Sequence, residues 1–229
     1  MERLQNGYTL NIVPGTFPLS TDSMLLADFV RLPKNARVLD LGSGCGTLGL
    51  LLCAMHSGCS VTGIELDNAA HDAAQDNIAR NGLQGRLSSI CTDLRSIPSL
   101  IPPGSFTCCI SNPPYFSGGP ASKTAPQARR DDTCSAAELC AAAAWAVRYG
   151  GDFFLVHKPE RLAQLMTQAS NAGLEPKRLR LVRHNPGRPI SMVLLQCRKG
   201  GKPGLVWEES CLFDIDGVPS EEYRRIYHF

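Results

Sequence analysis

A glycine-rich turn follows the first apolar strand-like run and is the first candidate ligand site. The run reads Val38-Leu39-Asp40-Leu41-Gly42-Ser43-Gly44-Cys45-Gly46-Thr47-Leu48-Gly49. Glycine lacks the Cβ that would keep a ligand away from the backbone. The part from Gly44 to Gly49 also matches the G-x-G-x-x-G dinucleotide fingerprint, so a nicotinamide or flavin site is one alternative. Asp40 argues against that alternative, because a carboxylate facing the turn repels a pyrophosphate and attracts an ammonium group.

Two further acidic residues stand where predicted strands end. Glu65 closes the second strand, where a carboxylate can accept from both ribose hydroxyls of a nucleoside. Asp93 ends the third strand and can accept from an adenine amino group, with Leu66 and Leu94 clasping the ring. Each acid alone could equally cap a helix or lie in solvent. Together with Asp40 they predict S-adenosylmethionine, which carries an ammonium, a sulfonium and an adenine nucleoside.

The predicted cofactor contacts on this reasoning are Asp40, Gly42, Ser43, Gly44, Gly46, Glu65, Leu66, Asp93 and Leu94.

A second motif, Asn112-Pro113-Pro114-Tyr115, follows the fourth predicted strand. In a doubly wound sheet this strand lies beside the first, which puts the motif next to the glycine turn. An exocyclic amine conjugated with a ring has no available lone pair until its nitrogen begins to pyramidalise. The Asn112 side-chain oxygen and the Pro113 carbonyl can each accept one N–H and hold that nitrogen toward a sulfonium methyl. Tyr115 offers a face for base stacking, which Phe116 can extend.

Methyl transfer to such a nitrogen depends on proximity, in-line orientation and stabilisation of the developing positive charge. It needs no strong base, and the sequence offers no candidate His, Cys or Ser dyad. The alternative is a rigid Pro-Pro turn that merely follows a strand. The predicted catalytic residues are therefore Asn112, Pro113, Pro114 and Tyr115.

Basic residues are concentrated in the second half of the chain and suit phosphate contacts. Residues 116–229 hold 16 of the 23 Lys and Arg residues, and the stretch from Lys177 to Lys202 contains no Asp or Glu. A base within a folded nucleic acid must leave its stack to reach a recessed pocket, which requires grip on the backbone. The alternative is a set of solvated surface charges. The predicted nucleic-acid contacts are Phe116, Arg129, Arg130, Lys158, Arg183 and Arg188.

Apolar runs of strand length alternate with amphipathic helical stretches, which is the pattern of a mostly parallel α/β sheet. The predicted strands are 36–41, 60–66, 86–91, 106–111, 153–157, 178–183 and 190–198. The predicted helices are 47–56, 68–81, 136–148 and 159–172. The short connection 184–189 demands an antiparallel pair. We therefore expect a doubly wound, Rossmann-like sheet that ends in an antiparallel hairpin, with a mobile loop at 116–133.

Length and composition indicate one catalytic domain. The 229 residues are 43% hydrophobic and 19% charged, which excludes a fibrous or disordered chain. Residues 1–33 are expected to form a lead-in strand and helix, 34–202 the core, and 203–229 a terminal strand and tail. No apolar stretch reaches the roughly 18 residues of a membrane span, and the first residues lack a signal-peptide h-region, so we expect a cytoplasmic protein without a membrane partner.

Cysteines and histidines give no metal signature. The 10 cysteines lie mostly in apolar runs and form no Cys-x-x-Cys pair, and the 5 histidines form no cluster. The cysteines therefore read as small buried hydrophobes, and no metal is expected. The oligomeric state stays open.

The chain resembles class I S-adenosylmethionine-dependent methyltransferases with an Asn/Asp-Pro-Pro-Tyr motif, which methylate amines of nucleic-acid bases or a glutamine amide. Over nearly its whole length it is similar to the tRNA(Val) adenine-N6 methyltransferase family, which modifies the adenine next to the anticodon. The resemblance implies a tRNA substrate and a segment 20–22 that caps the cofactor, with Thr21 in contact with it. The similar stretches are 17–27, 112–116, 151–162, 173–178 and 198–205.

The resemblance has one departure and leaves three alternatives. Ala128-Arg129-Arg130-Asp131 stands where family members often have Ala-Arg-His-Glu, which bears on how the tRNA is recognised. Protein glutamine N5-methyltransferases usually carry a helical N-terminal recognition domain, whereas this chain reaches its glycine turn by Gly42. Enzymes that methylate guanine N2 in rRNA are a closer alternative. An idle RNA-binding scaffold would predict a damaged glycine turn or tetrad, and both are intact.

Overall fold

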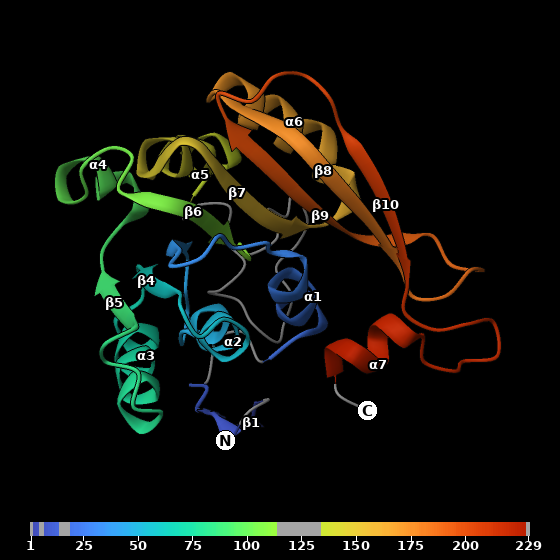
Figure 1. Cartoon of the computed structure of the whole chain (residues 1–229), viewed down its shortest axis with the longest axis horizontal. Coiled ribbons are helices and arrows are strands. Elements are labelled where there is room, and N and C mark those ends of the chain that lie inside the picture. Colours follow the sequence, from blue (N-terminus) through green and yellow to red (C-terminus); the bar gives the residue numbers. More distant parts are fainter. Residues whose placement is uncertain (1, 5–6, 14–18, 114–133, 228–229) are drawn as a thin grey trace.

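One large sheet organises the chain (Figure 1). The computed structural model describes residues 2–4, 7–13, 19–113 and 134–227. Among these residues, eight strands form one sheet in the order β10-β8-β9-β7-β6-β3-β4-β5. Neighbouring strands are parallel except at β9, which is antiparallel to both β7 and β8. The expected doubly wound sheet with a C-terminal antiparallel hairpin is confirmed.

The bounds of the elements follow the predicted order along the chain. The strands of the sheet are β3 (Arg37–Leu41), β4 (Ser60–Glu65), β5 (Leu87–Cys91), β6 (Phe106–Ser111), β7 (Val147–His157), β8 (Leu174–Arg183), β9 (Ile190–Lys199) and β10 (Val206–Cys211). The helices are α1 (Thr21–Phe29), α2 (Thr47–Met55), α3 (Asn68–Arg80), α4 (Ile97–Leu100), α5 (Ala136–Ala146), α6 (Leu162–Asn171) and α7 (Glu221–Tyr227). Two short strands, β1 (Glu2–Arg3) and β2 (Thr9–Leu10), form a separate antiparallel pair.

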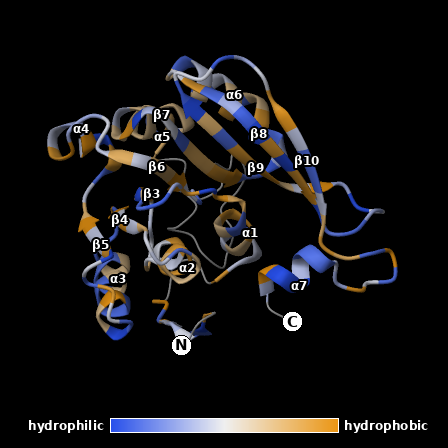
Figure 2. Ribbon diagram, in the orientation of Figure 1, coloured by the Kyte–Doolittle hydropathy of each residue, from blue (hydrophilic) through white to orange (hydrophobic). Residues whose placement is uncertain are grey.

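Helices cover both faces of the sheet (Figure 1). Side chains alternate between the faces along a strand, so Val38 and Leu39 enter different apolar clusters. The cluster around Val38 includes residues of α1, α2 and α3, and the cluster around Leu39 includes residues of α4, α5 and α6. In Figure 2 apolar colours dominate α2, whereas α7 is mainly hydrophilic. The two clusters hold the sheet rigid, and its strand ends can therefore position a site.

Two predicted boundaries are wrong. The strand predicted from Arg178 already begins at Leu174, and its register shifts between Pro176 and Arg178. The other error lies at the junction of α5 and β7. The sequence favoured a helix through Arg148 and a strand from Phe153, but the helix ends at Ala146 and β7 already begins at Val147. Val147 pairs with Phe106 of β6 and is fully buried, and the register shifts just after this pair. The β-branched valine and the following Gly-Gly pair allow this bulged start, which periodicity alone does not reveal.

The C-terminal residues contain more structure than a strand and tail. β10 lies beyond the hairpin and pairs in parallel with β8, so the sheet gains one further strand. The helix α7 was not predicted, because its seven residues are too few for a periodic apolar pattern to register. It contacts α1 through an ion pair between Arg225 and Asp28.

Asn77 of α3 and Asn81, the C-cap of this helix, attach the N-terminal segment to the core. The Asn81 side chain accepts from the Thr9 backbone N–H and donates to the Thr9 carbonyl, at 2.8 Å in both cases. Asn77 makes the same pair of bonds with Asn11 and donates a third, at 2.9 Å, to the carbonyl of Cys45. The fully buried Asn77 side chain therefore links the N-terminal segment to the glycine turn.

Candidate active site

The two turns singled out in the sequence lie side by side at the carboxyl edge of the sheet. β3 and β6 are parallel neighbours, and the Ser111 hydroxyl donates to the Leu41 carbonyl oxygen over 2.7 Å. Ser111 directly precedes Asn112, and Leu41 directly precedes Gly42. Since neighbouring strands lie about 4.8 Å apart, both turns start within one strand spacing of each other. The predicted adjacency is confirmed at Gly42 and Asn112, the residues with which the two turns begin.

The backbone of the glycine turn is held in left-handed conformations. Gly42, Gly44 and Gly46 have φ values of +75°, +55° and +83°, which L side chains rarely adopt. The backbone N–H groups of Gly42 and Ser43 both donate to the Ile64 carbonyl, at 2.9 and 3.0 Å. A Cβ built at Gly42 or Gly44 would meet no described atom within 4 Å. Open space therefore lies against the backbone at both positions.

Asp40 and Ser43 are buried beside this turn with unsatisfied polar atoms. Asp40 is 1% exposed, and neither of its carboxylate oxygens, nor the Ser43 hydroxyl, has a hydrogen-bond partner among the described residues. Burial, and secondly the charge of Glu65, raises the pKa of Asp40 to about 8. Gly63 makes room here, because a Cβ on it would lie 2.5 Å from the Ser43 hydroxyl oxygen. Buried polar atoms are normally satisfied, so the turn needs a ligand with donor groups.

Glu65 has a role at the end of β4 that the sequence analysis missed. Its two carboxylate oxygens accept from the backbone N–H groups of Gly44, at 2.7 Å, and Asp67, at 2.8 Å. The side chain therefore fixes the glycine turn from the neighbouring strand. A carboxylate has about four acceptor sites, so Glu65 can still accept from a ligand. No sequence pattern signals a contact between residues 21 positions apart.

Asp93 is engaged in a local ion pair. It caps the 3-10 helix Leu94–Ser96 by accepting from the Arg95 backbone N–H at 2.8 Å, and the Arg95 guanidinium Nε donates to it at 2.9 Å. These side-chain hydrogen bonds hold the pKa of Asp93 below its usual value. Leu66, which follows β4, is 49% exposed, whereas Leu94 packs partly against the core. An exposed leucine at a strand end is an apolar surface that a ring could cover.

The start of α1 contacts Asn112. Asn112 Nδ2 donates to the Ser23 hydroxyl oxygen at 3.1 Å, and Ser23 lies 3.3 Å from the hydroxyl of Ser20, the N-cap of α1. Thr21, the predicted cofactor contact, is the first residue of this helix and is half-buried. Pro113 is buried. The predicted capping segment and the predicted catalytic motif thus meet at one corner, which sequence separation hides.

Three of the predicted basic contacts lie in the described residues, and they differ in exposure and pairing. Lys158 directly follows β7 at the same edge of the sheet, and its charge acts on Asp22 of α1. Burial raises the pKa of Asp22, and the Lys158 ammonium partly offsets this. Arg188 is exposed in the β8–β9 turn, whereas Arg183 forms a 3.5 Å ion pair with Glu209. Because β9 is antiparallel to β7, this turn also lies at the carboxyl edge of the sheet.

Five predicted site residues lie outside the described ranges. They are Pro114, Tyr115, Phe116, Arg129 and Arg130, and the predicted mobile loop 116–133 lies there as well.

Within the described ranges, no three His, Cys, Asp or Glu side chains are grouped so as to hold a metal ion. None of the helices in those ranges has the length and apolar character of a membrane span.

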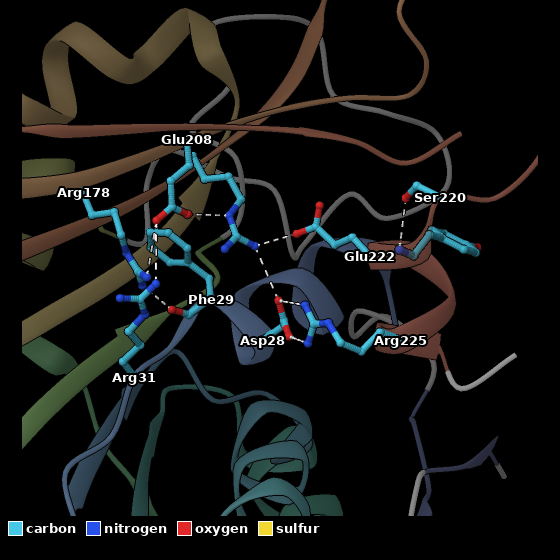
Figure 3. Close-up of polar contacts among 10 residues, drawn as sticks. Asp28, Phe29, Arg31, Arg178, Glu208, Ser220, Glu222 and Arg225 are labelled. Atoms are coloured by element: carbon cyan, nitrogen blue, oxygen red, sulfur yellow. Dashed lines mark hydrogen bonds and ion pairs between the residues drawn. The ribbon is translucent and has the colours of Figure 1, made fainter. Parts of the chain in front are cut away.

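Two arginines of the basic stretch from Lys177 to Lys202 are engaged within the fold and are not open to phosphates. Arg178 is buried, lies 3.9 Å from the ring centroid of Phe29 and donates to the Phe29 carbonyl (Figure 3). Burial lowers the pKa of Arg178 to about 10. Arg180 forms ion pairs with Asp28, Glu208 and Glu222 at 3.4, 2.9 and 2.9 Å.

These arginines instead join four elements of the fold. In Figure 3, Glu208 of β10, Glu222 of α7 and Asp28 of α1 surround the guanidinium groups. The acidic partners come from elements outside the stretch, so a search for acidic residues within it could not detect the pairing. The network holds α1, and with it Ser23, against the sheet.

A sheet of this order, with a glycine turn, strand-end acids and an Asn-Pro motif at its carboxyl edge, defines the class of S-adenosylmethionine-dependent methyltransferases. Residues 18–171 match the family described as methyltransferase small domain, and the chain belongs to this family. It is therefore a methyltransferase that depends on S-adenosylmethionine.

Named relatives and solved structures agree with this assignment. A tRNA1(Val) (adenine(37)-N6)-methyltransferase of Photobacterium profundum is 30% identical over 90% of this chain and 87% of its own length. An enzyme of the same name from Bacteroides fragilis is 30% identical over 77% of this chain and 75% of its length. The crystal structure of a predicted O-methyltransferase from Agrobacterium tumefaciens superposes with a TM-score of 0.75 at 19% identity, covering 91% of this chain and 96% of that one. At that identity the likeness supports the fold alone.

Proposed function

We propose that this enzyme methylates the N6 amine of an adenine in tRNA, the reaction for which its relatives are named. Those relatives act by name on adenine 37 of tRNA1(Val). The observation that carries the proposal is the position of Asn112, which directly follows β6, the strand beside the one that leads into the glycine turn. An amide oxygen at this place accepts an N–H from the target amine and brings its nitrogen toward the methyl donor.

The residues of the glycine turn fit the cofactor. The buried and unsatisfied Asp40 carboxylate offers acceptors for an ammonium group, and the open space at Gly42 and Gly44 lets a ligand touch the backbone. Glu65 keeps acceptor capacity for ribose hydroxyls, and the exposed Leu66 beside it offers an apolar surface to the adenine ring. When bound, S-adenosylmethionine supplies an electrophilic methyl group on its sulfonium.

The chain's own groups prepare the acceptor nitrogen. Asn112 Oδ1 and the Pro113 carbonyl oxygen together accept both N–H bonds of an exocyclic amine, which turns the nitrogen lone pair out of conjugation with the ring. As the nitrogen gains positive charge, the same two oxygens stabilise it, because hydrogen bonds to charged donors are stronger than those to neutral donors. After methyl transfer the cationic nitrogen loses one proton to solvent, which requires no strong base. Stacking of the base on Tyr115 and Phe116 remains a prediction.

Two described basic residues are suited to the RNA backbone. Lys158 follows β7 next to α1, and Arg188 is exposed in the β8–β9 turn at the same edge of the sheet. Three strand spacings of about 4.8 Å separate β6 from β8, and the register places Ile190 five residues beyond the level of Ser111, so this turn lies more than about 15 Å from Asn112. At that distance Arg188 can contact phosphates away from the target base but not the base itself. Arg183 contributes less, because Glu209 already pairs with it.

A labelling experiment tests the proposal. The purified enzyme is incubated separately with unmodified tRNA, with rRNA and with a protein extract, each with methyl-labelled S-adenosylmethionine, and the products are digested and analysed by mass spectrometry. N6-methyladenosine in tRNA supports the proposal. N2-methylguanosine in rRNA, or label in a glutamine side chain, would replace it with one of the two other amine acceptors of this motif. Asn112→Ala serves as the inactive control.

A further inference from the structure

We propose that Ser23 of α1 is a positioning residue that fixes the side-chain amide of Asn112 in the orientation needed for methyl transfer. The inference rests on the proposed function, in which Asn112 Oδ1 accepts an N–H from the target amine. Ser23 itself is not proposed to touch the cofactor or the substrate. It acts through Asn112, from which it is separated by 89 residues in the sequence.

The contact is direct, and its acceptor is buried. Asn112 Nδ2 donates to the Ser23 hydroxyl oxygen at 3.1 Å, and Ser23 is only 5% exposed. The hydroxyl of Ser20 lies 3.3 Å away, so the Ser23 proton can be donated there while its lone pairs face the amide. Ser20 is also the N-cap that accepts from the Ser23 backbone N–H. Ser23 is therefore held at both its backbone and its side chain.

The chemistry of an amide explains why orientation matters. The two ends of an asparagine side chain have nearly the same shape, but one end only accepts hydrogen bonds and the other only donates them. The χ2 torsion, which rotates the amide, has a broad range of allowed values. Neighbouring groups therefore decide whether the oxygen or the NH₂ group faces a given direction. With Nδ2 bonded to Ser23, Oδ1 remains for the substrate. In the reversed orientation, an NH₂ group would face the NH₂ group of adenine, and no hydrogen bond could form.

The anchoring of α1 extends this effect to the rest of the fold. Asp28 and Phe29 at the other end of the helix are bound by Arg180, Arg225 and Arg178. A helix fixed at both ends presents Ser23 at a constant distance from β6. This rigidity is what a positioning residue requires.

Steady-state kinetics of Ser23→Ala test the role. We expect kcat for tRNA methylation to fall about tenfold, the effect of one hydrogen bond, while the KM for tRNA and the Kd for S-adenosylmethionine change less than twofold. Ser23→Thr keeps the hydroxyl and should restore kcat. Ser210→Ala is the matched control, because Ser210 is also 5% exposed but lies on β10 at the edge of the sheet. Wild-type kcat in Ser23→Ala would overturn the proposal.

The same Ser23 substitution in the Asn112→Asp variant separates an effect on the orientation of the amide from general support of the site. In Asn112→Asp both side-chain oxygens accept, so orientation no longer matters, and Ser23→Ala should lower kcat less than twofold there. Equal losses in both backgrounds would show that Ser23 merely supports the fold. The Asp form belongs to the same motif, so we expect measurable turnover.

A spectroscopic readout keeps the test independent of turnover. The side-chain ¹H–¹⁵N signals of Asn112, identified by their disappearance in Asn112→Asp, should shift in Ser23→Ala and remain in place in Ser210→Ala. Unchanged signals would refute the contact. If wild-type enzyme methylates no tRNA, the proposed function fails, whereas the NMR comparison still decides whether Ser23 holds the amide.

Discussion

Replacing Asp40 by asparagine should make the ligand-free protein more stable and its cofactor binding weaker. Asp40 is 1% exposed, and its oxygens have no hydrogen-bond partner among the described residues. Burial and the nearby Glu65 charge raise its pKa from 3.8 to about 8. Asparagine has nearly the same shape and cannot ionise, so the substitution removes the charge while changing little of the packing.

The size of the effect follows from proton linkage. Because the pKa of Asp40 is higher in the folded than in the unfolded protein, its contribution to stability is fully present below pH 3.8. This contribution is lost progressively as the pH rises from 3.8 through about 8. At 1.36 kcal/mol per pH unit, the loss between pH 3.8 and pH 7 is about 4 kcal/mol. Asp40→Asn lacks this loss, so its Tm at pH 7 should exceed that of wild type by on the order of 10 °C.

Thermal or urea unfolding of both proteins from pH 4 to pH 8 measures the difference. All other ionisable groups are shared, so their contributions cancel when the two curves are subtracted. The advantage of Asp40→Asn should be near zero at pH 4 and should grow steadily toward pH 8. A difference that does not depend on pH would show that Asp40 does not titrate between these values in the folded protein.

Cofactor binding, unlike stability, favours aspartate over asparagine at position 40. An ammonium group beside Asp40 favours its ionised form, so S-adenosylmethionine binding at pH 7 should release close to one proton from wild type. Calorimetry in buffers of different ionisation enthalpy measures this release, which should be absent in Asp40→Asn. The variant should also bind the cofactor about 10- to 100-fold more weakly, the worth of a charged hydrogen bond. Equal proton release in both proteins would place the cofactor ammonium elsewhere.

Three further substitutions test the other parts of the site. Asn112→Ala should lower kcat at least 100-fold and leave the Kd for S-adenosylmethionine within twofold, as measured by calorimetry, since it removes an acceptor for the substrate alone; a matching loss of cofactor affinity would contradict this role. Glu65→Ala frees the Gly44 N–H and removes a ribose acceptor, so cofactor affinity should fall about tenfold or more, and unchanged binding would argue against the strand-end acid. Arg188→Glu should raise the KM for tRNA several-fold at low salt and hardly at all in 0.5 M salt, whereas Lys34→Glu, exposed before β3 at the opposite edge, should have no effect at either. Equal KM changes in these two variants would point to net charge rather than a local contact.

The parts of this molecule that were predictable are those determined by local pattern. Apolar runs and helical periodicity gave the order of strands, and the short 184–189 connection gave the antiparallel hairpin. The doubly wound topology then placed β6 beside β3 and brought the two turns together. The starts of β7 and β8 and the helix α7 were missed, because register shifts and a seven-residue helix leave no periodic signal.

In the site as well, local sequence pattern indicated the candidate residues but not the long-range contacts that fix them. Residue type and position at a strand end sufficed to select Asp40, Glu65 and Asn112. The bonds that fix these side chains, such as Glu65 to Gly44 and Asn112 to Ser23, join residues far apart in sequence. No local pattern encodes them, since they depend on which elements the fold brings into contact.

The basic stretch shows what a count of charges in the sequence cannot distinguish. Arg178 and Arg180 carry the same formal charge as exposed arginines, yet their acidic partners come from α1, β10 and α7. Within the segment alone, a structural arginine and a phosphate-binding arginine look identical. The distinction matters for function, because the structural arginines hold α1 in place and α1 holds Ser23 against Asn112. A change at Arg180 would therefore reach the acceptor amide without any contact with RNA, and a loss of activity there should be independent of salt. Loss at Arg188, in contrast, should depend on salt, so ionic strength separates the two classes of arginine that the sequence cannot distinguish.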